Sequence, residues 1–188
     1  MTPRVVIVGY DPAWPAMYEE EKALILGAIG PWVKGIEHVG STSVPGLAAK
    51  PIIDIMVGVW NLDDAAYCIG RLVTVGYDFK PDDDIPERRY FNKGPQARHR
   101  HLHMTELGGD FWLRHLLFRD YLRAHAETAR QYQALKRELA QLQANRAALT
   151  SPPRLESLNQ QLNLRMSPLR PAAEGERKET VALEKSSR

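Results

Sequence analysis

Residues suited to binding phosphate lie close together in the first third of the chain. Residues 40–43 read Gly-Ser-Thr-Ser, and Lys50 precedes an apolar run over residues 52–59 that contains Asp54. Glycine lets backbone N–H groups approach an anion closely, and hydroxyl groups add further donors. A carboxylate in an apolar strand is costly to bury without a partner, which Lys50 or a metal ion would supply. The alternative is a plain turn with a structural aspartate.

Two histidines separated by one residue form a second candidate site. If residues 101–104 are a strand, His101 and His103 point to one face of the sheet and Leu102 to the other. Two imidazoles near a carboxylate make a metal site or an acid–base site, and the neighbouring Arg98 suits an anionic substrate. The alternative is a pair of surface histidines.

A third candidate is the pair Arg119 and Arg123, which are four residues apart and therefore share one face of a helix. They are suited to reach a phosphate. The alternative is that they form surface ion pairs with Asp120 or Glu127.

The elements that position these residues follow from hydrophobic spacing. Apolar residues at helical intervals predict helices, and short β-branched or apolar runs predict strands. The predicted helices cover residues 14–29 and 61–75. A longer helical stretch over 111–143 is predicted to form two helices or one bent helix. The predicted strands cover residues 35–39, 52–59, 77–79, 89–92 and 102–105. We expect an extended entry segment over residues 5–9 and one helical turn over 47–49.

Composition fits a globular protein of one domain followed by a tail. The chain has 188 residues with a net charge of +2, and residues 1–149 carry equal numbers of acidic and basic side chains. A neutral body argues against nucleic acid as a partner. Residues 167–188 are rich in Pro, Ser and charged groups, so they are expected to be disordered and removable. We therefore expect a domain over residues 1–149 and a partly disordered tail over 150–188.

The predicted location is the cytoplasm. The single cysteine, Cys68, cannot form an internal disulfide, which fits a reducing compartment. No window reaches the roughly 18 apolar residues that a membrane span requires, and the N-terminal apolar run is too short for a signal peptide.

Four sequence motifs resemble those of the GrpB family. Residues 38–54 read HVGSTSVPGLAAKPIID, and the runs YDPAWP (10–15), RHRHLHM (98–104) and FRDYLR (118–123) resemble other motifs of that family. The resemblance covers residues 5–142. It implies a nucleotidyltransferase-like α/β (α+β) fold, a mixed sheet of about five strands flanked by helices. We expect residues 52–59 to form the central strand, with helices 14–29 and 61–75 packed on the sheet.

The resemblance also implies a site. In nucleotidyltransferases a Gly-Ser turn grips nucleotide phosphates, and acids on the next strand hold a divalent metal ion. Gly40 and Ser41 match that turn and Asp54 matches the first acid, but Met56 stands where a second acid is usual. His101 and His103 lie where a third acid is expected, which would favour Mn²⁺ or Zn²⁺ over Mg²⁺.

The expected function is that of a metal-dependent nucleotidyltransferase-like protein, acting on or binding a nucleotide, or another phosphorylated small molecule, and a small acceptor. The expected metal ligands and catalytic residues are Asp54, His101 and His103. The expected phosphate-binding residues are Gly40, Ser41, Ser43, Lys50, Arg98 and Arg119. The alternatives are a non-catalytic nucleotide-binding domain and a helical interaction module. Similar segments form the C-terminal domain of some dephospho-CoA kinases, but this chain has no phosphate-binding loop of the kinase type.

Overall fold

The structure is a computed structural model that describes residues 6–94 and 100–161. The chain divides into two units, Met1–Ala140 and Gln141–Arg188. Its helices are α1 (Trp14–Ile29), α2 (Ala65–Thr74), α3 (Asp110–Ala124), α4 (Ala126–Leu149) and α5 (Pro152–Gln161). Its strands are β1 (Gly35–Val39), β2 (Ile53–Val59), β3 (Asp78–Lys80), β4 (Arg88–Lys93) and β5 (Arg100–Glu106). Short 3₁₀ turns occur at Gly30–Trp32, Ser41–Ser43 and Leu62–Asp64.

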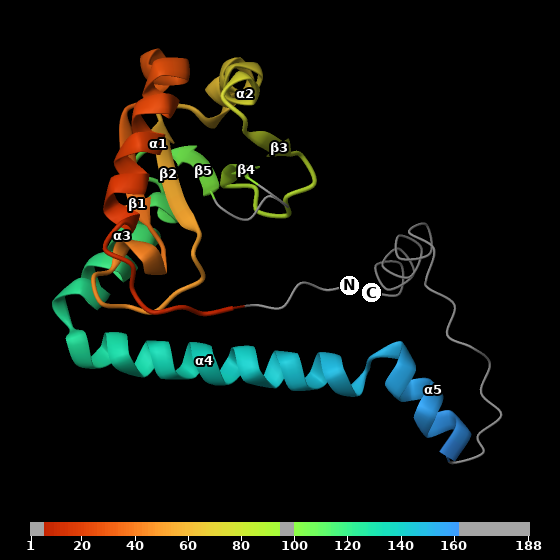
Figure 1. Ribbon diagram of the computed structural model, residues 1–188. Coiled ribbons are helices and arrows are strands. Elements are labelled where there is room, and N and C mark those ends of the chain that lie inside the picture. The colour runs from red at the N-terminus through yellow and green to blue at the C-terminus, as the bar shows by residue number, and fades with distance from the viewer. Residues whose placement is uncertain (1–5, 95–99, 162–188) are drawn as a thin grey trace, which may run out of the picture. The chain divides into compact units, whose positions relative to one another are not determined.

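The five strands form one mixed sheet in the order β1-β2-β5-β4-β3 (Figure 1). Strands β2 and β5 are parallel, and every other neighbouring pair is antiparallel. The prediction of a five-stranded mixed sheet is confirmed. We expected residues 52–59 to be the central strand, but β5 occupies the middle and β2 is the interior strand beside it.

The two faces of the sheet are covered differently because side chains alternate along each strand. Ile55 and Leu102 point into the main core, where they pack with residues of α1 and α2 such as Ile25 and Leu72. Met56 points to the opposite face and packs against Trp112 and its neighbours on α3. The predicted packing of the first two helices on the sheet is confirmed, and α3 covers only part of the other face.

The boundaries of the predicted elements agree closely with the structure, and one predicted element is absent. The long helical stretch is two helices, one of its two expected forms, and they separate at His125 (φ −125°, ψ 80°). Residues 47–49 were expected to form a helical turn, and this is wrong. Ala49 instead pairs with Val8 through two backbone hydrogen bonds of 2.9 and 3.0 Å, which hold the segment extended.

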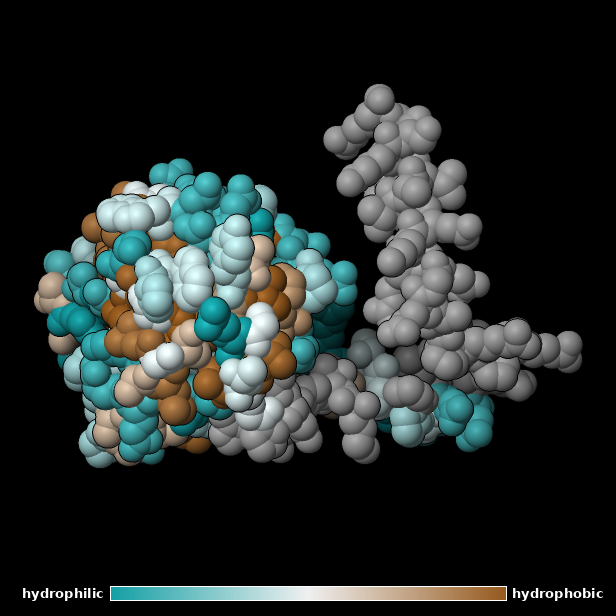
Figure 2. Space-filling view, turned by 90° about the horizontal axis from the view of Figure 1, so that it is seen from above, coloured by the Kyte–Doolittle hydropathy of each residue, from teal (hydrophilic) through white to brown (hydrophobic). Residues whose placement is uncertain are grey.

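On the surface that Figure 2 shows, hydrophobic residues are mixed with hydrophilic ones. Among the described helices, none combines the length and the apolar composition that crossing a membrane requires. The tail over residues 167–188 lies outside the described residues, so its expected disorder stays a prediction, as does the expected domain limit at residue 149.

Candidate metal and phosphate site

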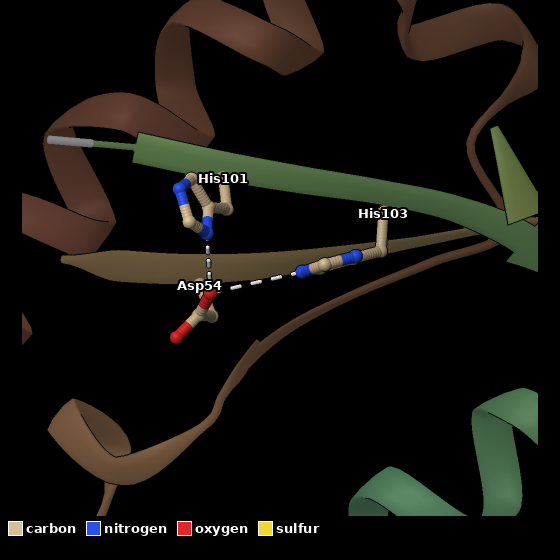
Figure 3. A group of neighbouring side chains, drawn as sticks. All are labelled: Asp54, His101 and His103. Atoms are coloured by element: carbon tan, nitrogen blue, oxygen red, sulfur yellow. Dashed lines mark ion pairs between the residues drawn. The ribbon is translucent and has the colours of Figure 1, made fainter. Parts of the chain in front are cut away.

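Asp54, His101 and His103 come together on one face of the sheet. Because β2 and β5 run parallel, Asp54 lies directly beside His101 in the ladder. The Oδ1 atom of Asp54 is 3.2 Å from Nδ1 of His101 and 3.7 Å from Nε2 of His103. Figure 3 shows both imidazoles directed toward this carboxylate. We call these three residues the Asp54 cluster.

The sequence positions these side chains through strand alternation. Leu102 separates the two histidines and is fully buried in the main core, so the imidazoles must point to the opposite face. Likewise Ile53 and Ile55 are buried on either side of Asp54, which places the carboxylate on the imidazole side. Asp54 therefore lies within 4 Å of both imidazoles.

The carboxylate of Asp54 is held in its ionised form. Burial alone raises its pKa, but the neighbouring imidazoles of His101 and His103 outweigh burial and lower the pKa to about 2. The side chain is 27% exposed, so a ligand can still reach it. A negative, accessible oxygen beside two nitrogens is a donor set that binds divalent metal ions.

The environment of His103 differs from that of His101. His103 is 8% exposed, and its Nδ1 atom lies 2.8 Å from Nη1 of Arg88. Arg88 is itself held by Asp83 through bonds of 2.7 and 2.8 Å, which lower the pKa of Asp83. Burial, with a smaller contribution from Arg88, lowers the pKa of His103.

The turn at Gly40 lies against the Asp54 carboxylate. Gly40 has φ 71° and ψ −172°, a conformation that is essentially restricted to glycine. A Cβ atom at this position would lie 2.4 Å from Oδ2 of Asp54. The hydroxyl of Ser43 donates to the carbonyl of Gly40 at 2.6 Å, and the hydroxyl of Thr42 donates to the carbonyl of Ile52 at 3.0 Å. These two bonds fix the turn in place beside β2.

A pocket of about 270 Å³ opens beside the Asp54 carboxylate, and we call it the Lys136 pocket. Its lining residues are Ser41, Thr42, Ala49, Lys50, Ile52, Asp54, His101 and Lys136. Lys136, on α4, donates to the hydroxyl of Ser41 at 2.8 Å. Burial lowers the pKa of Lys136, opposed by the charge of Asp54 and assisted by Lys50. The pocket therefore places two cations and a hydroxyl group near the carboxylate.

Two of the predicted phosphate-binding residues lie elsewhere. Ser43 and Arg119 line a separate hollow of about 380 Å³. Nη1 of Arg119 donates to Glu37 at 2.6 Å and to the carbonyl of His38 at 3.0 Å, and its Nε donates to Asp120 at 2.7 Å. Arg119 is thus engaged by two carboxylates, and its surroundings match the ion-pair alternative. Arg98 lies outside the described residues.

Sequence reasoning missed two residues at this site. Lys136 is distant from Ser41 in sequence, and it lies in a helix whose hydrophobic spacing gives no sign of a partly buried cation. The only sequence signal is that Leu135-Lys136 resembles a later motif of the GrpB family. Arg88 precedes the predicted strand 89–92 and was given no role, because its contact with His103 depends on the register between β4 and β5.

The donor set of the Asp54 cluster fits a divalent transition metal. The three candidate ligand atoms, one oxygen and two nitrogens, all lie within 4.8 Å of one another. Mixed imidazole and carboxylate ligands suit Zn²⁺ or Mn²⁺, whereas Mg²⁺ prefers oxygen ligands alone.

Comparison with known proteins agrees with the motifs. "UPF0157 protein YqkA" of Bacillus subtilis is 42% identical over 137 residues, which cover 73% of this chain and 40% of that protein. "Glutamate-rich protein GrpB" of Alkalihalophilus pseudofirmus is 36% identical over 146 residues, which cover 75% of this chain and 84% of the relative. This chain thus spans less than half the length of YqkA.

A solved structure and a kinase also match. The crystal structure of conserved protein GrpB from Enterococcus faecalis aligns with a TM-score of 0.69 and 38% identity, covering 73% of this chain and 84% of that one. A dephospho-CoA kinase of Mycolicibacterium paratuberculosis is 32% identical over 162 residues, which cover 40% of its length. The model of the family described as "GrpB protein" matches residues 4–151. The chain therefore belongs to the GrpB family.

Proposed function

We propose that this protein binds a divalent metal ion at the Asp54 cluster and acts on the phosphate groups of a nucleotide or another small phosphorylated molecule. The observation that supports this proposal is the convergence of Asp54, His101 and His103 beside a pocket that also contains Lys50 and Lys136. A carboxylate with two imidazoles favours a metal cation, and two lysines beside it favour an anionic ligand. The reaction class that fits this combination is nucleotidyl transfer to a small acceptor.

The residues of the Lys136 pocket have distinct roles in this proposal. A bound metal ion would neutralise phosphate oxygens as a Lewis acid. Lys50 and Lys136, which line the same pocket, would supply positive charge to stabilise the negative charge that develops on a leaving phosphate. Ser41 accepts a hydrogen bond from Lys136, so its own O–H remains able to donate to a phosphate oxygen.

A second candidate function is nucleotide binding without transfer, and Met56 favours it. Met56 takes the position of the expected second acid, but it is fully buried and packs against Phe111 and Trp112. The Asp54 cluster therefore contains one carboxylate, whereas a two-metal mechanism relies on several. A single-metal site can still bind a phosphate without catalysing its transfer.

The alternative of a helical interaction module has less support than these two functions. Gln133 of α4 accepts a hydrogen bond from the backbone N–H of Ala48 at 2.7 Å, and Lys136 of the same helix reaches Ser41. This part of α4 is therefore used to complete the pocket.

Thermal unfolding with added metal and nucleotide tests the proposal. We expect Zn²⁺ or Mn²⁺ to raise the melting temperature and a nucleoside triphosphate to raise it further. A ligand at 100 times its Kd adds about 2.7 kcal/mol of stability. Asp54→Asn should remove both shifts, whereas Asp82→Asn, at an exposed aspartate, should keep them. Equal shifts in both variants, or none in the wild type, would contradict the proposal.

Product analysis separates transfer from binding. The protein is incubated with metal and a nucleoside triphosphate, and phosphorus NMR follows the mixture. Release of pyrophosphate that depends on Asp54 supports nucleotidyl transfer. A triphosphate that binds but stays intact with every acceptor tried supports the binding function.

A further inference from the structure

The contact between Arg88 and His103 restricts where His103 carries its proton. A guanidinium group has only N–H donors and no acceptor. At a separation of 2.8 Å, Nη1 of Arg88 must therefore donate to Nδ1 of His103. Nδ1 is then the nitrogen with the lone pair, so in the neutral ring the proton resides on Nε2. It is this Nε2 that faces Asp54, at 3.7 Å from Oδ1.

A nitrogen that carries a proton cannot ligate a metal ion. Coordination through Nε2 would require the proton to move to Nδ1, and Arg88 would then have to leave. His101 is not restricted in this way, because the guanidinium of Arg88 contacts the ring of His103. A metal ion can therefore take the place of a proton on the His101 nitrogen that faces Asp54, at 3.2 Å, without displacing an arginine.

Arg88 is firmly held in its position. Its Nε and Nη2 donate to the two carboxylate oxygens of Asp83, and the two side chains are only 15% and 16% exposed. The guanidinium also lies over the ring of Tyr90, 4.7 Å from its centroid, and 5.6 Å from that of Phe111. Moving Arg88 away from His103 would disturb this mostly buried ion pair with Asp83, which is costly in free energy.

We propose that Arg88 is a positioning residue that makes His103 present an N–H to Asp54, so that His103 assists the carboxylate instead of ligating the metal ion. The proposal rests on the proposed metal site and redefines its membership: Asp54 and His101 hold the ion. The N–H of His103 is 3.7 Å from Oδ1 of Asp54, which is longer than a direct hydrogen bond. At this distance its positive end still stabilises the ionised form of the carboxylate. An outer hydrogen-bonding partner of this kind orients a metal ligand and tunes its charge.

The proton position on His103 can be measured without any metal. Long-range ¹H–¹⁵N correlation NMR of the labelled protein at pH 8 distinguishes a protonated ring nitrogen from an unprotonated one. We expect a proton on Nε2 in the wild type and a shift toward Nδ1 in Arg88→Met. Arg89→Met, which changes the neighbouring strand residue on the opposite face, should leave the proton on Nε2. A proton on Nδ1 in the wild type would overturn the proposal, whatever the function of the site.

Metal affinity then tests the division of roles by calorimetry with Zn²⁺ and Mn²⁺. His103→Gln keeps an N–H and should weaken binding less than about 10-fold, whereas His101→Gln should weaken it more than about 100-fold. Equal losses in the two variants would show that His103 is a ligand, and would overturn this inference while the metal site stands. If the wild type binds no metal, the proposed function fails and the NMR result alone decides the role of Arg88.

Discussion

Gly40 combines two constraints that no other amino acid satisfies. Its backbone lies in a region that costs other residues of order 1–3 kcal/mol, and a Cβ would collide with Oδ2 of Asp54. We therefore expect Gly40→Ala to lower the free energy of unfolding by at least about 1–3 kcal/mol and to displace the carboxylate. Chemical denaturation and metal titration would measure the two effects.

Gly70 provides a matched control for this substitution. It lies inside α2, and apart from adjacent residues and the backbone of its own helix nothing lies within 4 Å of the position of a Cβ. Gly70→Ala should stabilise the protein by about 0.5–1 kcal/mol, because alanine has the higher helix propensity. Destabilisation by both substitutions to the same extent would contradict the special role of Gly40.

His38 makes stability depend on pH. Thr42 gives its one hydroxyl proton to the carbonyl of Ile52, so it accepts a hydrogen bond from Nε2–H of His38 at 3.0 Å. Burial lowers the pKa of His38 to about 4, although Asp54 acts to raise it. Below pH 6.5 the unfolded chain binds a proton that the folded protein does not, so stability falls between pH 6.5 and pH 4.

Replacing His38 tests this dependence. The loss should approach about 3 kcal/mol near pH 4, and His38→Gln should remove that part of it. Denaturation midpoints of the wild type and the variant, measured from pH 7 to pH 4, would show the difference. Parallel curves for the two proteins would mean that His38 does not cause the loss.

At the scale of elements, a pair of glycines determines how α3 meets the sheet. Gly35 of β1 and Gly58 of β2 are partners in the ladder, and a Cβ at either would lie 2.8 Å from Leu107 and within about 3 Å of Trp112. The two glycines form a flat surface on which the indole of Trp112 packs, and this packing covers the face that carries the Asp54 cluster.

We expect Gly58→Ala to cost about 1–3 kcal/mol through overpacking. The same substitution in a Leu107→Ala background should cost less, because the nearest atom has been removed. A double-mutant cycle of denaturation free energies measures the coupling. Full additivity would show that the contact with Leu107 does not cause the loss.

The sequence was informative about individual elements and less so about their pairing. Alternation placed His101 and His103 on one face, and helical spacing predicted α1 and α2. The family resemblance implied that Asp54 and the two histidines share a site. Local patterns do not encode the register through which β2 and β5, far apart in the chain, pair. For the same reason the contacts of Lys136 and Arg88 became visible only in the fold.

At the scale of the whole molecule, the site belongs to the unit Met1–Ala140. Gln133 and Lys136, whose side chains form hydrogen bonds with the loop after β1, precede the end of this unit. A chain that ends at Ala140 should therefore keep its melting temperature within a few degrees and keep any metal binding. A chain that ends at residue 130 should lose both contacts and be clearly less stable, as calorimetry would show.

The parallel pairing of β2 with β5 also has a kinetic consequence. The strands are separated in sequence by α2, β3 and β4, so their pairing closes a long loop, and such non-local contacts form late in folding. Asp54 and His101 are brought together by this ladder. A chain in which β5 has not yet paired with β2 therefore has no assembled set of metal ligands. Metal capture would then be a final step of maturation, and the ion would slow unfolding much more than it speeds folding.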